Sequence, residues 1–351
     1  MSLQNELLAK LLTVRDGNLN VSLVSSFQHE CIGLPDELHI FLPDIHLITG
    51  ERQAEVDFGC STNYEDLLTD LVRQLKSFKV AKGGLPVTVH QLGDLLDLWR
   101  QAPQLDQSQD LGAWIANDHQ NLMSALLDNE LDMQFLLGNH DFNLCRCPNF
   151  DGWRSNVYLK NPAGTATAIA LHGHVFDWEQ DALNTLPEPV KDALVCLSAP
   201  IWPPGTRQLG ELIALNSQAR QRMPNLNQYI QAPKPVALGR TVSAGGEVPA
   251  RFNVQTETDH LQDGMKYVDA ARALCQTANQ KYGTKLNMVV IGHTHHARIA
   301  VAEDGEGSFV LVDAGAWIEQ YLTPESEQPF KNAQIAAVGG NQARIYQLQP
   351  R

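Results

Sequence analysis

The sequence predicts a layered α/β protein in which β-sheet packs between helices. Short apolar runs of strand length alternate along the chain with longer segments whose apolar residues recur at helical spacing. Hydrophobic residues make up 43% and charged residues 19% of the 351 residues, which is the composition of a folded globular chain. A chain of this length can bury a substantial core and enclose a pocket.

Six apolar runs have the length and composition of strands. They are Leu38–Leu42, Pro86–Leu92, Met133–Leu137, Thr167–Leu171, Asn287–Ile291 and Phe309–Val312. Each run stops at a polar or glycine-containing cluster, where a strand is expected to end.

Three longer segments are predicted to be helices. In Tyr64–Phe78, apolar residues stand at positions 67, 68, 71, 72, 75 and 78, which places them on one helical face. Leu111–Leu127 is predicted as a second helix, with Asp110 placed to cap its first turn. Met265–Tyr282 is predicted as a third.

The segment Leu183–Glu257 breaks this alternation. Nine of the 18 prolines lie between Pro187 and Pro249, which argues against a long helix or a central strand there. We therefore expect a single domain over residues 1–351 with an insertion at 183–257. The insertion begins and ends next to the polar clusters at the strand ends, so it is a candidate lid that selects the substrate. The alternative is that it packs on the far side of the domain and has no role in substrate binding.

Charge and apolar patterning restrict the partners. Lys and Arg number 26 against 40 Asp and Glu, a formal net charge of −14, which disfavours binding to nucleic acid or an anionic membrane. No apolar run is long enough to span a membrane. The N-terminal residues lack the basic and apolar regions of a signal peptide. Six scattered cysteines do not make a disulfide framework, so we expect a cytoplasmic protein; its oligomeric state is left open.

Polar clusters of one kind follow five of the strands. They are Asp44-Ile45-His46, Gly93-Asp94, Gly138-Asn139-His140-Asp141, His172-Gly173-His174 and Gly292-His293-Thr294-His295. Ligands usually bind where strand ends converge. In an extended D-x-H or H-x-H segment, residues two apart point to one side, so each pair can offer two ligands to one centre. Oxygen and imidazole donors suit manganese first, with iron, zinc, magnesium or nickel as alternatives.

The five clusters, in this order, resemble the motifs of the calcineurin-like metallophosphoesterase superfamily. The resemblance runs from Asp44 to His295 and implies a four-layer α/β/β/α sandwich with two divalent metal ions at the strand ends. One ion would be held by Asp44, His46, Asp94 and His295. The other would be held by Asp94, Asn139, His172 and His293, with Asp94 bridging the two.

The resemblance also implies roles for residues beside the metals. His140 matches the residue that contacts the phosphate and protonates the leaving oxygen, and Asp141 would orient its ring. His174 would lie behind His172, near the substrate. Arg146 is a candidate substrate contact. Asp97 is interpreted as a residue behind the ligands or as a carboxylate at a helix start.

The expected function is hydrolysis of a phosphomonoester or phosphodiester of a small soluble substrate by a hydroxide that bridges the two ions. The motif pair Gly93–Trp99 and Gly138–Phe142 is also similar to the subgroup that contains UDP-2,3-diacylglucosamine hydrolase, a pyrophosphatase, which is the first alternative. A protein phosphatase or a nuclease is disfavoured, the nuclease because the chain lacks a basic stripe. A non-catalytic scaffold on the same fold is the alternative from another class.

Overall fold

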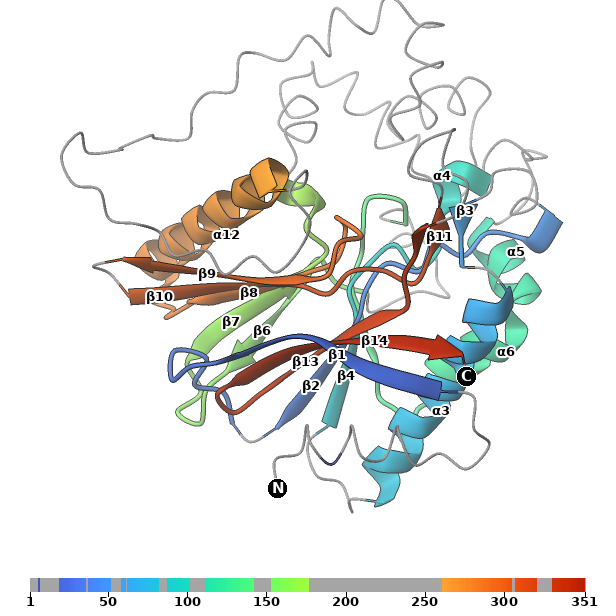
Figure 1. Ribbon diagram of the computed structural model, residues 1–351, viewed down its shortest axis with the longest axis horizontal. Helices are drawn as coiled ribbons and strands as arrows, with labels where there is room; N and C mark the ends of the chain where they lie inside the picture. Colours follow the sequence, from blue (N-terminus) through green and yellow to red (C-terminus); the bar gives the residue numbers. More distant parts are fainter. Residues whose placement is uncertain are drawn as a thin grey trace, which may run out of the picture.

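The computed structural model shows a mixed α/β protein with two mixed β-sheets and few helices (Figure 1). It describes Glu6 and residues 19–35, 37–51, 58–60, 62–81, 87–101, 111–141, 153–176, 261–304, 307–320 and 330–350. Arg146 and the proline-rich insertion at 183–257 lie outside the described residues, so their predicted roles stay predictions.

The first sheet has six strands. In spatial order they are β1 (Leu19–Gln28), β14 (Gln342–Pro350), β13 (Gln334–Gly339), β2 (Leu38–Leu42), β4 (Val87–Gln91) and β5 (Gln134–Phe135). Strands β2, β4 and β5 are parallel, and the other three pair antiparallel. The carboxyl ends of the three parallel strands therefore lie at one edge of the sheet.

The second sheet has five strands. Their order is β6 (Asn156–Lys160), β7 (Ala166–Leu171), β8 (Met288–Ile291), β10 (Gly307–Asp313) and β9 (Arg298–Asp304). Here β7, β8 and β10 are parallel, with antiparallel strands at both edges. A small three-stranded sheet joins β12 (Phe330–Lys331), β11 (Glu319–Gln320) and β3 (Phe58–Gly59).

Helices flank the two sheets in Figure 1. Those that the structure describes are α3 (Thr62–Ala81), α4 (Leu98–Gln101), α5 (Leu111–Asp118), α6 (Gln120–Leu126) and α12 (Leu261–Tyr282), together with the 3-10 turn η4 (His174–Phe176). The six apolar positions that predicted the first helix are all buried in α3, as expected for an amphipathic helix on a sheet.

Among the described residues, buried apolar side chains gather in three cores. The first joins α3, α5 and α6 to the six-stranded sheet, the second lies between the sheets, and the third joins the five-stranded sheet to α12. Successive side chains of a strand belong to different cores because they point to opposite faces of the sheet. Thus Ile40 belongs to the first core and Phe41 to the second, whereas Val289 belongs to the third and Val290 to the second.

The six predicted strands are all present as β2, β4, β5, β7, β8 and β10, with ends that differ by two residues at most. One helix prediction is wrong in part: Leu111–Leu127 forms two helices rather than one. The backbone breaks at His119 (φ −108°, ψ 40°), whose ring bonds to Glu65 of α3 and to the carbonyl of Ile48. Asp110, the predicted cap, lies outside the described residues.

No helix within the described part of the chain is both long and apolar enough to cross a membrane.

Candidate metal centre

The polar clusters lie together because the parallel strands of both sheets end at the same place. Strands β2, β4 and β5 of one sheet and β7 and β8 of the other each lead into one cluster. Backbone hydrogen bonds join the loops that follow: the Gly292 amide donates to the His172 carbonyl (3.0 Å), and the His46 amide donates to the Asp94 carbonyl (2.8 Å). Residues far apart in the sequence thus form one rigid site.

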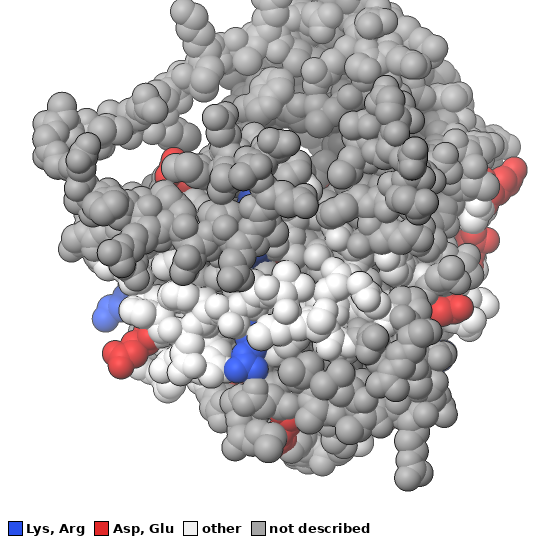
Figure 2. All heavy atoms as spheres, viewed as in Figure 1, with Lys and Arg blue, Asp and Glu red and all other residues white. Residues whose placement is uncertain are grey.

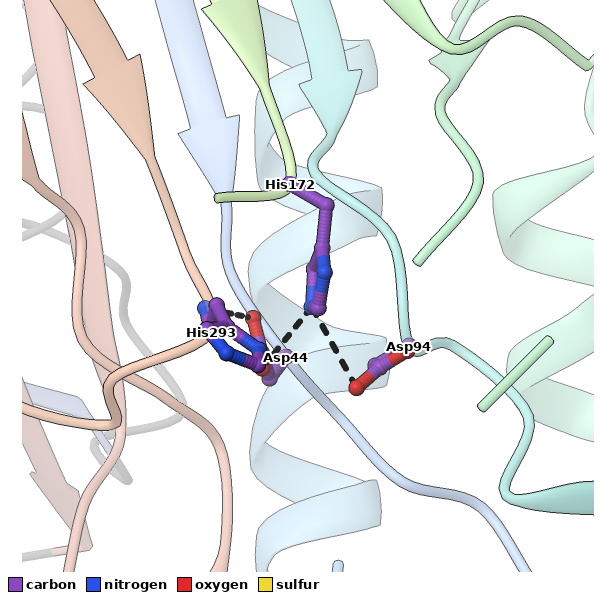
Figure 3. Close-up of side chains that lie close together, drawn as sticks. All are labelled: Asp44, Asp94, His172 and His293. Atoms are coloured by element: carbon purple, nitrogen blue, oxygen red, sulfur yellow. Dashed lines mark hydrogen bonds and ion pairs between the residues drawn. The ribbon is translucent and has the colours of Figure 1, made fainter. Parts of the chain in front are cut away.

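The first group of candidate ligands consists of Asp44, Asp94, His172 and His293 (Figure 3). His172 Nε2 lies 3.2 Å from Asp44 Oδ2 and 3.2 Å from Asp94 Oδ2. The His293 amide donates to Asp44 Oδ1 at 2.8 Å. The two carboxylates and His172 are buried, and His293 is partly exposed. One ligand atom from each residue lies within 4.8 Å of the others, which is close enough to surround one ion.

The second group consists of Asp44, His46 and His295. His295 Nε2 lies 3.2 Å from Asp44 Oδ2 and 3.1 Å from His46 Nε2. Asp44 is therefore common to both groups, whereas the sequence predicted Asp94 as the shared residue. Asp94 Oδ2 nevertheless lies 3.6 Å from His46 Nε2 and 3.2 Å from His172 Nε2, so this carboxylate contacts a member of each group.

Asn139 provides a direct test of whether these residues suit a metal ion. Its Oδ1 atom is buried and has no hydrogen-bond partner among the described residues. A buried amide oxygen without a partner costs about 1–3 kcal/mol, so such an atom requires an explanation. The next residue, His140, donates its backbone N–H to Asp94 Oδ1 at 2.8 Å, which places the Asn139 turn against a candidate ligand. The carboxylate, imidazole and amide donors fit a divalent cation.

Backbone strain is concentrated in the candidate ligands. Of five described non-glycine residues with positive φ, four are His46 (53°), Asp94 (52°), His293 (71°) and His295 (60°). This conformation costs on the order of 1–3 kcal/mol at each position and persists only where the surroundings impose it. The prediction that the D-x-H and H-x-H segments are extended is therefore wrong, although their side chains do converge. Left-handed turns, rather than strand pleating, direct them to one centre.

It is Asp97, not Asp141, that holds the ring of His140. Asp97 Oδ1 accepts from His140 Nδ1 (2.8 Å), and its Oδ2 accepts from His46 Nδ1 (2.9 Å). The Asp141 carboxylate instead accepts backbone N–H groups of Leu95 (2.8 Å) and Gly138 (2.7 Å). Through these hydrogen bonds, Asp141 connects the loop after β4 with the loop after β5. Asp97 also directly precedes α4, which agrees with a carboxylate at a helix start, and with His46 and His140 it forms a third group of possible metal ligands.

His174 lies behind His172, as predicted. The two Nδ1 atoms are 3.0 Å apart, and His172 Nε2 faces the carboxylates. If His172 binds a metal through Nε2, its Nδ1 carries the proton and donates to His174. The substrate contact predicted for His174 is not tested by this arrangement.

Most of the buried charge among the described residues lies in this region. The buried acidic side chains are Asp44, Asp94, Asp97, Asp141 and Asp313, and the buried basic one is Arg298. With every carboxylate ionised these groups carry a net charge of −4, which two divalent cations would balance. Buried charges left unbalanced are strongly unfavourable, so the donor set favours bound cations.

Without cations, protons must balance part of this charge. Burial would lower the pKa of His46, but hydrogen bonds to Asp44 and Asp97 outweigh it and raise that pKa to about 9. The pKa of His172 is likewise raised well above its usual value, because the Asp94 and Asp44 carboxylates outweigh burial. Burial and the Asp94 charge raise the pKa of Asp141 to about 7. Divalent cations would replace these protons.

Three residues that hold the loop with His293 and His295 were not predicted: Thr294 within it, and Arg298 and Asp313 behind it. Thr294 donates a short hydrogen bond to Asp313, and Arg298 Nη2 lies 3.3 Å from Asp313 Oδ2. Asp313 ends β10 and is followed by Gly315, so it shares the strand-end position of the other clusters. That position was a signal that could have identified it.

Comparison of the chain with models of protein families finds no match, and comparison with curated proteins finds none either. The assignment of function therefore depends on the residues and their geometry.

Proposed function

We propose that this protein is a dinuclear metal-dependent phosphohydrolase that cleaves phosphomonoesters or phosphodiesters of a small soluble molecule. The observation that carries the proposal is the convergence of two groups of Asp and His side chains around Asp44, beside a histidine held by a carboxylate. Neither structural histidines nor surface carboxylates account for this many buried ionisable groups in one place.

The order of the motifs and the fold support membership of the calcineurin-like metallophosphoesterase superfamily. The three cores follow the order helix, sheet, sheet and helix, which is the order that a four-layer α/β/β/α sandwich requires. The candidate ligands follow the parallel strands in the sequence expected for that family. Fold similarity alone does not fix an activity, so the site carries the functional part of the proposal.

We assign one ion to Asp44, His46, Asp94 and His295, and the other to Asp94, Asn139, His172 and His293. The contacts of Asp94 Oδ2 with His46 and His172 support its place between the two ions. The buried Oδ1 atom of Asn139, which has no hydrogen-bond partner among the described residues, supports the assignment of Asn139 as a ligand. As a neutral donor, this amide leaves more positive charge on the site than another carboxylate would. Donors of this kind suit manganese first.

When bound, two divalent cations would lower the pKa of a coordinated water and stabilise negative charge on a phosphoester. The chain itself supplies the proton for the leaving group. Asp97 holds His140 through Nδ1 and so fixes the ring. Burial lowers the pKa of His140, although the Asp97 and Asp94 carboxylates oppose that shift. The contacts of His140 with Asp97 and with Asp94 support a position close to the candidate metal ligands.

The acidic chain narrows the substrate class. On the face drawn in Figure 2, the described Lys and Arg side chains stand apart from one another and form no basic patch. With a net charge of −14, attraction for a phosphate must come from bound cations rather than from the protein surface. This supports a small phosphoester over a nucleic acid.

Purified protein reconstituted with Mn²⁺ should be screened against bis-p-nitrophenyl phosphate, p-nitrophenyl phosphate, nucleotides and UDP-sugar pyrophosphates. The proposal predicts metal-dependent hydrolysis of at least one phosphomonoester or phosphodiester. Hydrolysis of UDP-sugar pyrophosphates alone would favour the pyrophosphatase alternative. Binding of metal without any hydrolysis would favour the non-catalytic scaffold.

A further inference from the structure

The loop Gly292–His296 carries two candidate ligands in a strained conformation. His293 (φ 71°) and His295 (φ 60°) both occupy the left-handed region, with Thr294 between them. Side chains other than glycine avoid this region, at a cost of roughly 1–2 kcal/mol per residue. Neighbouring groups must therefore hold the loop, and the hydrogen bonds of Thr294 show how.

The Thr294 hydroxyl closes the loop on itself and fixes it to the sheet. Its Oγ1 accepts the backbone N–H of His296 at 3.1 Å and donates to Asp313 Oδ2. The Thr294 amide donates to the Gly292 carbonyl at 2.8 Å. The Thr294 side chain thus connects the His296 end of the loop to a carboxylate on β10, and the Thr294 backbone amide binds the Gly292 end.

Asp313 is itself rigidly placed. It is fully buried at the end of β10, directly opposite Arg298 in the antiparallel pairing with β9. Arg298 Nη2 lies 3.3 Å from Asp313 Oδ2, and the guanidinium lies 5.9 Å from the centre of the Tyr267 ring on α12. Two strands and a helix therefore define the position of this carboxylate.

Fold stability does not explain such an arrangement. A buried ion pair often contributes less to stability than apolar side chains of the same volume would, because both charges must leave water. Asp313, paired with Arg298, accepts a hydrogen bond from Thr294, the residue that separates two strained histidines. Fixed geometry at those histidines is what the arrangement provides.

We propose that Asp313, held by Arg298, is a positioning residue that keeps His293 and His295 in metal-binding geometry through its hydrogen bond with Thr294. This inference rests on the metal site of the proposed function. It assigns a role to residues that touch neither metal nor substrate and act through the loop backbone. Groups behind metal ligands commonly change metal affinity by about 10–100-fold.

Two substitutions of Thr294 distinguish the effect of its hydroxyl group from the effect of its side-chain shape. Thr294→Val keeps the volume and branching but removes the hydroxyl, whereas Thr294→Ser keeps the hydroxyl. A matched control is Thr69→Val, because the Thr69 hydroxyl also donates a hydrogen bond, to the Glu65 carbonyl in α3, away from the site. If Thr294→Val does not fold, Thr294→Ala replaces it in the test, because alanine also lacks the hydroxyl and adds no apolar volume beside Asp313.

The measurement is calorimetric titration of metal-free protein with Mn²⁺, together with the thermal midpoint of each metal-free variant. We expect the Kd of the weaker bound ion to rise about 10–100-fold in Thr294→Val. Thr294→Ser should restore it to within about threefold of the wild type, and Thr69→Val should leave it unchanged. If Thr294 had a purely structural role, we would not expect Thr294→Val to lose metal affinity and Thr294→Ser to restore it while all thermal midpoints stay equal.

Equal Mn²⁺ affinity in Thr294→Val and the wild type would overturn the inference while leaving the metal site intact. The same holds if Thr294→Ser loses as much affinity as Thr294→Val, because the hydroxyl would then not matter. If the wild type itself binds no Mn²⁺, the proposed function fails, and this inference fails with it for that separate reason.

Discussion

At the scale of single residues, Asp97 links a candidate metal ligand to the histidine assigned to proton transfer. One of its oxygens holds His46 and the other holds His140, and the His46 and His140 rings lie edge to face with centres 4.8 Å apart. A single buried carboxylate therefore orients both rings at once. Because both rings bond to it, Asp97 would connect metal binding with leaving-group protonation in the proposed function.

Replacing His140 should separate these two functions. His140→Ala should keep both metals but lower kcat by ~10²–10⁴-fold on substrates with poor leaving groups, which need a proton from a general acid. The loss should be much smaller with p-nitrophenyl substrates, because p-nitrophenolate departs without a proton. Steady-state kinetics on both substrate types, with metal content as the control, test this. Equal losses on both types would mean that His140 binds the phosphate rather than donating a proton.

Asp94→Ala should instead remove metal. Its carboxylate contacts His46 and His172, members of the two ligand groups, so its loss should lower bound metal and abolish turnover. Elemental analysis after reconstitution measures the metal directly. Asp70→Ala is a suitable control, because Asp70 is a half-exposed carboxylate on α3 that pairs with Arg73. Full metal occupancy in Asp94→Ala would refute this assignment.

The residue types of the candidate site could be predicted from the sequence, but their exact contacts could not. Asp44, His46, Asp94 and His172 stand at strand ends, and the motif order identified them. Hydrogen-bond partners depend on side-chain directions set by turns that only the fold defines. That is why Asp141 was assigned the contact that Asp97 makes, and why Thr294 was not singled out.

At the scale of secondary-structure elements, glycines let the strand ends approach each other. A Cβ atom on Gly292 would overlap the Asp44 carboxylate, and one on Gly138 would overlap Asp94. The loops after β8 and β5 can therefore lie against the carboxylates only because these positions lack a side chain.

Gly292→Ala should therefore displace Asp44 and weaken metal binding by about 10-fold or more. Gly50→Ala is the matched control, because a Cβ there would lie 3.7 Å from the Asp118 carboxylate, an ordinary contact. Mn²⁺ titration of both variants measures the difference. Unchanged affinity in Gly292→Ala would show that the approach of this loop to Asp44 is not needed.

His119 joins three elements and should make stability depend on pH. Its Nδ1 lies 2.9 Å from Glu65 Oε2 and its Nε2 lies 2.7 Å from the Ile48 carbonyl oxygen. Only the protonated ring can donate to both. Burial opposes protonation, but the bonds to Glu65 and to the Ile48 carbonyl outweigh it and raise the pKa of His119.

A raised pKa in the folded state stabilises the protein fully below the unfolded value of about 6.5, and this contribution is lost as pH rises through the folded value. His119→Gln should therefore lower the free energy of unfolding by about 1.5–3 kcal/mol at pH 5.5 and by less at alkaline pH. Urea unfolding of both proteins from pH 5.5 to 9 measures this difference. A difference that does not shrink with rising pH would show that His119 is neutral in the folded protein.

Element prediction succeeded for the central parallel strands and missed strands that pair antiparallel. The central parallel strands are continuous apolar runs, because both of their faces are buried. Strands β1, β6, β9, β13 and β14 were not predicted. In β1 serines interrupt the alternation, and the register shifts between Leu23 and Ser25, so no regular period marks the strand.

At the scale of the whole molecule, the buried charges and the net charge of the chain have different effects. The formal charge of −14 disfavours contact with polyanions, while five buried carboxylates lie at a single site among the described residues. Bound cations would convert that site into a positive centre on an acidic protein. Binding of a small phosphate would then depend on metal and only weakly on the surface.

The most direct test is to titrate metal-free protein with Mn²⁺ while following hydrolysis of bis-p-nitrophenyl phosphate. Two ions that share one site predict activity that is absent without metal, rises with added Mn²⁺ and levels off at two equivalents per chain. Hydrolysis that is independent of metal, or no hydrolysis at any Mn²⁺ ratio by protein shown to bind the ion, would contradict the assignment of a dinuclear phosphohydrolase.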